Sequence, residues 1–301
     1  MNKPEINLTP TATLLEIESA KKIPCRTWGI ASESNTAFLL VHGLGGHSGW
    51  FEALARRLKV KHTFVMALDL AGFGSRRDDT DTSIDRWLKD IEAVSCYLHS
   101  LMGDKPVFLL GNSMGGLLAL KACNRCKPSG LILLSPAFGG HPKLFPMSYQ
   151  LSSLVSAILF PDKEITLPYN TEDITQDEQV QVWLDKYGNN RAAVPAKVLL
   201  DLLFATLALR FKNIVLPCPL LMITAGKDCI VSNKNSDLIF RQVKNPEKKK
   251  VVMSKSMHDL TLDLAIDEVT ESVINWTNAI SQRALKNQKD KQSEVLGKNK
   301  V

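Results

Sequence analysis

Short apolar runs alternate with longer helical patterns along most of this 301-residue chain. Each run suits a strand that is buried on both faces, and the segments between them repeat apolar residues at helical spacing. This alternation predicts a mostly parallel sheet covered by helices on both faces. The predicted strands span 38–41, 64–68, 107–110, 131–134, 220–223 and 251–253, with a poorly marked first strand within 13–30, and the clearest helices span 83–101, 116–126 and 266–280.

The segment 136–216 breaks this rhythm, because it contains loops and helical patterns but no clear strand. Its helical pieces, 147–160 and 194–211, are rich in Leu, Val and Phe. We interpret it as a helical cap over the carboxyl edge of the sheet, where ligands bind in open α/β folds. The predicted organisation is an α/β core over 12–135 and 217–284, a cap over 136–216, and a basic, disordered tail over 285–301.

Composition excludes several classes of protein. Hydrophobic residues make up 45% of the chain and charged residues 23%, which is typical of a globular domain. Much of the net charge of +6 lies in the tail and in 248–250, and we interpret it as solvated surface; attraction to an anionic membrane or an acidic lipid is the alternative. Nucleic acid is not a predicted partner, because no aromatic–basic surface pattern accompanies the charge.

The N-terminus lacks the apolar core of a signal peptide, and no apolar run is long enough to cross a bilayer. A cytoplasmic protein with reduced thiols is therefore expected. The six cysteines are scattered, and the one pair spaced as C-x-x-C, at 123 and 126, has no second pair to complete a zinc site. No metal is predicted.

The segment 111–116 reads Gly-Asn-Ser-Met-Gly-Gly, and it follows a predicted strand and opens a predicted helix. In this setting a G-x-S-x-G pattern predicts a tight turn that exposes the serine hydroxyl at the edge of the sheet. Glycines flank the serine because side chains there would collide with neighbouring elements. Ser113 is therefore the candidate nucleophile of a serine hydrolase.

A nucleophilic serine needs a general base, and that base needs an acid to orient it. Folds with this turn place the three along the chain in the order serine, acid, histidine. Asp228 follows the strand 220–223 and His258 follows the strand 251–253, so both are expected at the edge that carries Ser113. Asp259 is a weaker candidate acid, because a residue adjacent to His258 is poorly placed to face its ring.

Two backbone amides are predicted to stabilise the oxyanion of acyl transfer. One is that of Met114, directly after the nucleophile. The other is that of Leu44, in the glycine-rich loop 42–46 after the first clear strand. The loop 69–75 lacks the third glycine of a dinucleotide fingerprint, so no cofactor is predicted, and Asp69 is expected to hydrogen-bond near the loop at His42.

Together these motifs resemble the α/β-hydrolase superfamily, and within it the group of monoacylglycerol lipases, lysophospholipases and serine aminopeptidases. The resemblance spans about 26–283 and implies an eight-stranded, mostly parallel sheet, a helical cap, and hydrolysis of an acyl ester without a cofactor. One position departs from the pattern, since the group commonly has His before the nucleophile where this chain has Asn112. The motifs that carry the resemblance are 42–46, 69–74, 111–116, 226–228 and 257–258.

The predicted function is hydrolysis of carboxylic esters of medium- or long-chain acyl groups through an acyl-enzyme. The apolar stripes of the cap would form the wall for the acyl chain, and cap helices could rest on a membrane surface. A thioesterase or aminopeptidase with the same triad is the alternative, and a non-enzymatic receptor is a third. The sequence does not indicate the oligomeric state. The predicted substrate-binding residues are His42, Gly43, Ile230, Leu154 and Leu203.

Overall fold

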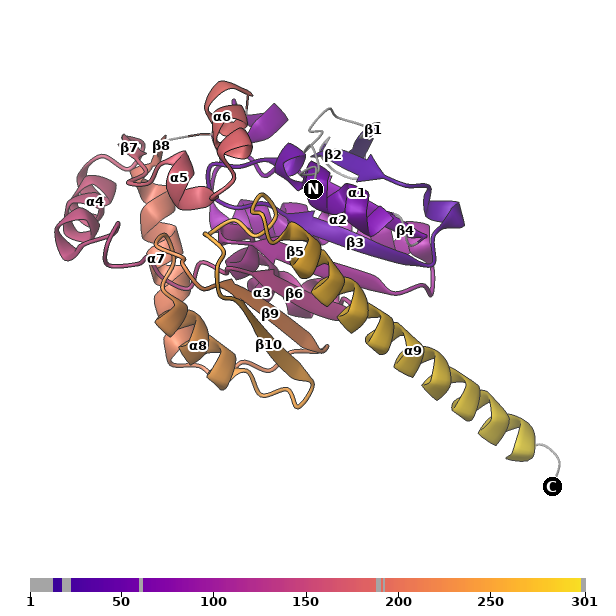
Figure 1. Ribbon diagram of the computed structural model, residues 1–301. Coiled ribbons are helices and arrows are strands. Elements are labelled where there is room, and N and C mark those ends of the chain that lie inside the picture. The colour runs from indigo at the N-terminus through magenta and orange to yellow at the C-terminus, as the bar shows by residue number, and fades with distance from the viewer. Residues whose placement is uncertain (1–12, 18–22, 60–61, 188–190, 192, 299–301) are drawn as a thin grey trace.

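The computed structural model describes residues 13–17, 23–59, 62–187, 191 and 193–298. Its centre is the predicted eight-stranded sheet, in the order β1-β2-β4-β3-β5-β6-β9-β10 (Figure 1). β2 is antiparallel to both neighbours, and the other six strands, β4, β3, β5, β6, β9 and β10, are parallel to one another. The strands are β1 (Thr13–Ile17), β2 (Ile23–Trp28), β3 (Thr36–Val41), β4 (Thr63–Leu68), β5 (Val107–Asn112), β6 (Gly130–Leu134), β9 (Leu220–Ala225) and β10 (Lys248–Met253).

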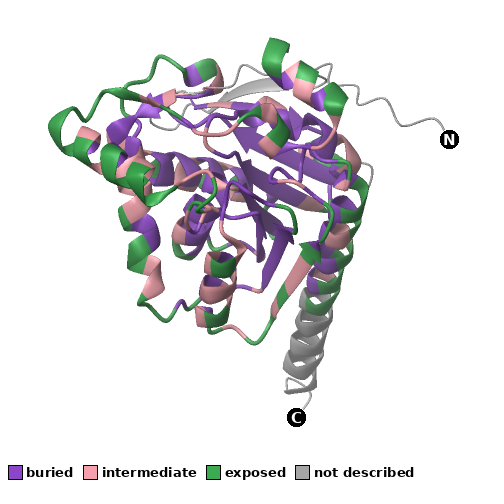
Figure 2. Cartoon of the chain, turned by 60° about the vertical axis from the view of Figure 1, so that its left-hand side comes forward, coloured by how far each residue is buried: buried purple, intermediate pink, exposed green. Residues whose placement is uncertain are grey.

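Helices cover both faces of the sheet, as the alternating pattern predicts. On β3, Phe38 and Leu40 join the cluster with α1 and α9, whereas Leu39 and Val41 join the cluster with α2, α3 and α8. Because successive side chains of a strand point to opposite faces, a strand between two helical layers must be apolar throughout. Figure 2 shows the resulting buried centre. These helices are α1 (Glu52–Lys59), α2 (Ile84–Met102), α3 (Met114–Cys126), α8 (Asn233–Gln242) and α9 (Ile266–Lys298), with short 3₁₀ turns at η1 (Ala31–Glu33), η2 (Ser48–Phe51) and η3 (Gly74–Arg76).

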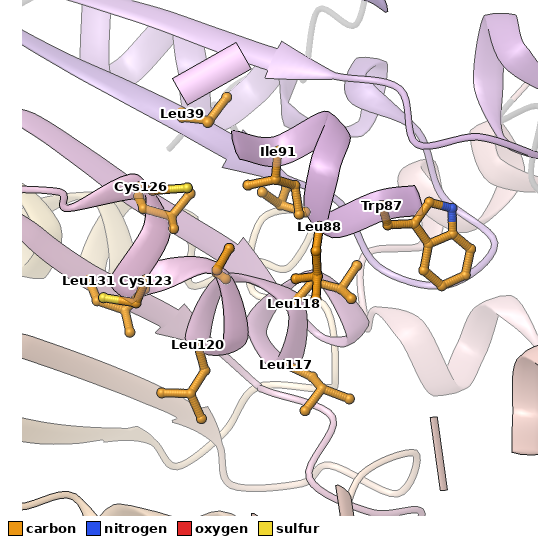
Figure 3. Close-up of a cluster of buried hydrophobic side chains, with 14 of the residues drawn as sticks. Leu39, Trp87, Leu88, Ile91, Leu117, Leu118, Leu120, Cys123, Cys126 and Leu131 are labelled. Atoms are coloured by element: carbon orange, nitrogen blue, oxygen red, sulfur yellow. The ribbon is translucent and has the colours of Figure 1, made fainter. Parts of the chain in front are cut away.

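Helix α2 shows how local sequence sets an element. The Ser83 hydroxyl accepts a hydrogen bond from the amide of Arg86 and caps the helix, which ends at Gly103 with φ 60°. The apolar stripe of α2 packs with residues of α3 into one cluster, in which Leu88, Ile91 and Leu118 lie together (Figure 3). This packing fixes α3, and therefore the serine at its start.

The segment 136–216 holds α4 (Met147–Leu159), α5 (Thr171–Ile174), α6 (Glu178–Tyr187) and α7 (Ala196–Arg210). Helices α4 and α7 contact one another at the side of the sheet (Figure 1). The expectation of no strand here is wrong, because β7 (Glu164–Thr166) and β8 (Ala193–Pro195) form an antiparallel pair. Three-residue strands are too short to show an alternating pattern in the sequence. The assignment of 136–216 as a separate cap stays a prediction.

The two ends of the chain also differ from expectation. The region 13–30 contains two strands, β1 and β2, rather than one. At the other end, α9 continues to Lys298, whereas the sequence predicted a disordered tail from residue 285. No proline or glycine interrupts 281–296, and its Ala, Leu, Lys, Gln and Glu residues are good helix formers, so the helix extends along the basic segment.

Candidate active site

Ser113 lies between β5 and α3, with φ 54° and ψ −119°. A positive φ is strained for a residue with a side chain, and the turn keeps it because the neighbouring backbones are close. A Cβ on Gly111 would lie 2.1 Å from the Gly115 carbonyl oxygen, and a Cβ on Gly115 would lie 2.0 Å from that of Val41. The glycines are therefore a steric requirement of the turn, as the motif predicts.

The structure brings Ser113, His258 and Asp228 together. The Ser113 Oγ lies 2.8 Å from Nε2 of His258, and Nδ1 of His258 lies 2.8 Å from Oδ2 of Asp228. The other carboxylate oxygen, Oδ1, accepts hydrogen bonds from the amides of Ile230 and Val231 at 2.9 Å each. The Asp228 carboxylate is thus held from both sides and fixes the plane of the imidazole ring.

The electrostatics suit a base at His258. Burial lowers the pKa of His258, but the charge and hydrogen bond of Asp228 and the charge of Asp259 raise it, and the net shift is upward. With a proton on Nδ1 donated to Asp228, Nε2 carries the lone pair and accepts the Ser113 hydroxyl hydrogen. This is the arrangement that a general base for serine requires.

The glycine-rich loop reaches the serine from the other side. A Cβ on Gly43 would lie 3.0 Å from the Cβ of Ser113, so only glycine fits there without a shift of the nucleophile. Leu44 and Met114 both line the cavity that contains Ser113. Among the described residues, neither of their backbone amides donates to a protein acceptor. Both N–H groups are therefore available to a ligand at the serine.

His42 and Gly43, the other two predicted substrate-binding residues, are not among the residues that line the cavity at Ser113, and their contact with substrate stays a prediction. His42 instead makes contacts within the core. Its ring is buried, Nδ1 donates to the Gly43 carbonyl at 2.8 Å, and Nε2 accepts from the Leu70 amide at 3.1 Å. Burial lowers the pKa of His42 to about 4, so the ring is neutral near pH 7. Since the Leu70 amide can only donate, the Nδ1–H tautomer is fixed and orients the Gly43–Leu44 peptide.

A cavity of about 650 Å³ opens from Ser113 between the sheet edge and helices α4, α7 and α8. Three of the predicted substrate-binding residues line it, namely Leu154, Leu203 and Ile230. Its walls are mostly apolar, and no Asp or Glu stands among the described lining residues. The lining also includes three cationic residues, Arg210, Lys234 and Arg241.

One contact beside the site was not predicted from the sequence, although both of its residues were noted there. Asn112 Nδ2 donates to Oδ2 of Asp259 at 2.8 Å, which ties the residue before the nucleophile to the residue after the base. Asp259 also accepts from Thr261, and burial raises the pKa of its carboxyl. It therefore faces Asn112 rather than the imidazole of His258.

Asp69 accepts from the amides of Ser48 and Ser75, which agrees with its expected structural role.

In the described parts of the chain, no group of three or more His, Cys, Asp and Glu side chains comes together as a metal site would require. The helices searched there include none with both the length and the apolar character needed to traverse a bilayer.

Known proteins resemble this chain in sequence and in fold. Residues 32–265 match the family model described as Hydrolase_4, serine aminopeptidase, S33. Monoglyceride lipase of Homo sapiens is 27% identical over 266 residues, which cover 86% of each chain. The fold is similar to that of a soluble variant of Saccharomyces cerevisiae monoglyceride lipase, solved with a substrate analog, at TM-score 0.82 and 19% identity over 92% of this chain and 98% of that one.

The monoacylglycerol lipase of Paleococcus ferrophilus gives TM-score 0.76 at 19% identity, over 87% of this chain and 99% of that one. The resemblance predicted from the motifs is thereby confirmed, and so is the fold class. The match to the family model spans well over half of the chain. The chain belongs to the serine aminopeptidase S33 family and is a monoglyceride lipase-like α/β hydrolase.

Proposed function

We propose that this protein hydrolyses carboxylic esters of medium- or long-chain acyl groups, with Ser113 as nucleophile, His258 as base and Asp228 as the orienting acid. One observation carries the proposal: the two 2.8 Å contacts that join the three side chains stand at the opening of a large apolar cavity. A hydrogen-bonded chain of this kind activates serine for attack on a carbonyl.

In the first step, Oγ of Ser113 attacks the ester carbonyl carbon while its proton passes to Nε2 of His258. The imidazolium that forms is stabilised by the carboxylate of Asp228. The tetrahedral intermediate then collapses, and the proton on Nε2 passes to the departing alkoxide to release the alcohol. Water, deprotonated by the same nitrogen, attacks the acyl-enzyme and releases the fatty acid.

The oxyanion of both tetrahedral intermediates would accept hydrogen bonds from the amides of Leu44 and Met114. The Met114 amide opens α3, so the positive end of that helix dipole supports the developing charge. The Leu44 amide belongs to the peptide that His42 orients through the Gly43 carbonyl. Donors fixed before the reaction stabilise the transition state without reorganising during it.

The acyl chain would lie against the apolar wall of the cavity, at Leu154 on α4 and Leu203 on α7. Each methylene removed from water contributes about 0.8 kcal/mol, so a long chain gains binding energy that an acetyl group lacks. The Homo sapiens and Saccharomyces cerevisiae proteins that this chain resembles are monoglyceride lipases. We therefore place lipid monoesters first among the substrates.

The outer surface of α4 and α7 suits access to such lipids. Large apolar side chains there are exposed, including Met147 and Ile158 on α4 and Phe204 on α7, with Phe211 directly after α7. An exposed apolar patch beside a lipid-sized cavity is typical of contact with a membrane interface. Peripheral membrane contact through this surface is part of the proposal.

An aminopeptidase is the alternative that the family description raises, and the cavity argues against it. A free amino terminus needs a carboxylate partner, and the described lining contains none. Two acidic residues of the cap make local contacts instead: Asp173 belongs to the capping box of α5, and Asp177 accepts from backbone amides at the start of α6. A thioesterase shares the triad chemistry and stays as a second candidate for the assay.

The test is hydrolysis of p-nitrophenyl esters from acetate to palmitate by the wild type and by Ser113→Ala. Turnover that rises with chain length and falls at least about 10³-fold in the variant supports the proposal. Acyl thioesters of the same chain lengths, assayed in parallel, distinguish a thioesterase. Equal inactivity of wild type and variant on every ester would contradict the proposal.

A further inference from the structure

The loop that carries the Leu44 amide is held from two directions. From the core, His42 donates to the Gly43 carbonyl at 2.8 Å. From the segment 136–216, the hydroxyl of Tyr169 donates to the Leu44 carbonyl at 3.3 Å, and the amide of Arg191 donates to the Gly45 carbonyl at 2.8 Å. The two peptide groups that flank the α-carbon of Leu44 are therefore pinned by different parts of the molecule.

The contact between this loop and the segment 136–216 is direct. Gly45 has φ +83°, and a Cβ there would lie 2.9 Å from the Arg191 carbonyl oxygen and 3.7 Å from the hydroxyl oxygen of Tyr169. The guanidinium of Arg191 also donates to the Gly72 carbonyl at 2.9 Å and pairs with Glu164 at 2.6 Å. A displacement of this segment would therefore pull on the loop beside Ser113.

The segment 136–216 also hydrogen-bonds to the loop that carries His258. The Asp259 amide donates to the Ile174 carbonyl at 2.8 Å, directly after His258. The buried hydroxyl of Thr175 donates to the Leu262 carbonyl at 2.8 Å. Residues 169–175 thus bridge the two loops that must face Ser113 from opposite sides during acyl transfer.

We infer that Tyr169 is a positioning residue for the reaction, which fixes the oxyanion loop through the Leu44 carbonyl. The inference rests on the proposed hydrolytic function and adds to it a requirement: the cap segment 169–175 must be seated for the oxyanion donors to align. Tyr169 suits this role because burial raises the pKa of its phenol, so the hydroxyl stays a donor at neutral and alkaline pH. When residues 169–175 are displaced, the oxyanion donors are no longer aligned and acyl transfer is slow.

The test is Tyr169→Phe, which keeps the ring and removes only the hydroxyl. We expect kcat on p-nitrophenyl butyrate to fall about tenfold with KM unchanged, because one neutral hydrogen bond that aligns the loop is lost. The rate at which a fluorophosphonate probe labels Ser113 should fall by a similar factor, since the phosphoryl oxygen occupies the same site as the oxyanion. Thermal unfolding checks that the variant folds.

Tyr97→Phe is the matched control, because Tyr97 lies near the end of α2 and packs on the core. That end of α2 leads to the start of β5, whereas Ser113 follows the end of β5, so the two residues lie at opposite edges of the sheet. Its kcat and labelling rate should equal those of the wild type. Wild-type kcat in Tyr169→Phe, or a raised KM with unchanged kcat, would overturn the inference and leave the proposed function standing. A wild type that neither cleaves esters nor reacts with the probe would overturn both.

Discussion

Helices α3 and α4 are each thirteen residues long, but α3 buries most of its apolar side chains whereas α4 exposes most of its own. In α3, ten residues are buried, among them Leu117 and Leu118. In α4 only Ser153 and Ala157 are buried, while Leu151 is 58% exposed. An apolar sequence therefore stabilises the core in one helix and remains available for a ligand or a surface in the other (Figures 2 and 3).

This difference suggests a division of labour, in which the core performs the chemistry on any substrate and the helices α4 and α7 select the acyl chain. Variants in the two regions should then differ in kind as well as in size.

Asp228→Asn should lower kcat about 10⁴-fold on short and long esters alike, because the imidazole loses its orienting carboxylate. The dependence of activity on pH is a second measurement of the same effect. As the proposed base, His258 must be neutral to accept a proton, so activity should rise with pH through its pKa, which Asp228 raises. In the variant the acidic limb of residual activity should move to lower pH. A limb at the wild-type pH would show that another group, such as Asp259, sets the pKa.

Leu118→Ala should destabilise the protein by about 3 kcal/mol, since a fully buried leucine leaves a cavity in the core between α2 and α3. Urea denaturation measures the change in free energy of unfolding. Below the unfolding transition, the remaining folded fraction should keep the wild-type preference for chain length. A changed preference would break the proposed division between core and cap.

Leu203→Trp should reduce kcat/KM for p-nitrophenyl palmitate about tenfold and leave the acetate ester nearly unaffected. Leu203 lines the cavity in which we propose that the acyl chain lies, so the added volume takes space that a long chain would occupy and disfavours its binding. The ratio of the two specificity constants is the measurement. An equal loss on both esters would mean that the side chain acts on Ser113 instead.

Leu151→Ala should change the free energy of unfolding by less than about 0.5 kcal/mol, because most of the side chain is already in water. Binding to phospholipid vesicles should weaken, as measured by co-sedimentation, because this leucine belongs to the exposed apolar surface of α4. A stability loss as large as that of Leu118→Ala would show that α4 is packed after all, in an assembly that covers it.

Much of this molecule was predictable because its signals are local. A strand buried on both faces must be apolar, and a strand–turn–helix with glycines around a serine has one steric solution, so β5, α3 and Ser113 could be placed from their neighbours in sequence. Strand ends likewise indicated Asp228 and His258. The short strands β7 and β8 were missed because three residues are too few to show an alternating hydrophobic pattern. The extension of α9 to Lys298 was missed because the charge of that segment suggested disorder.

Local sequence patterns were enough to predict the alternation of strands and helices, the turn at Ser113 and the chain order of Ser113, Asp228 and His258. The packing of the folded chain decided which contacts His42 makes, since its two ring nitrogens bond to Gly43 and Leu70, which follow different strands. It also decided the pairing of Asn112 with Asp259 and of Tyr169 with Leu44. The reason is that a hydrogen bond between residues on different elements, 28 positions apart for His42 and Leu70 and more than a hundred for the other two pairs, depends on how whole elements pack, which local sequence patterns do not encode.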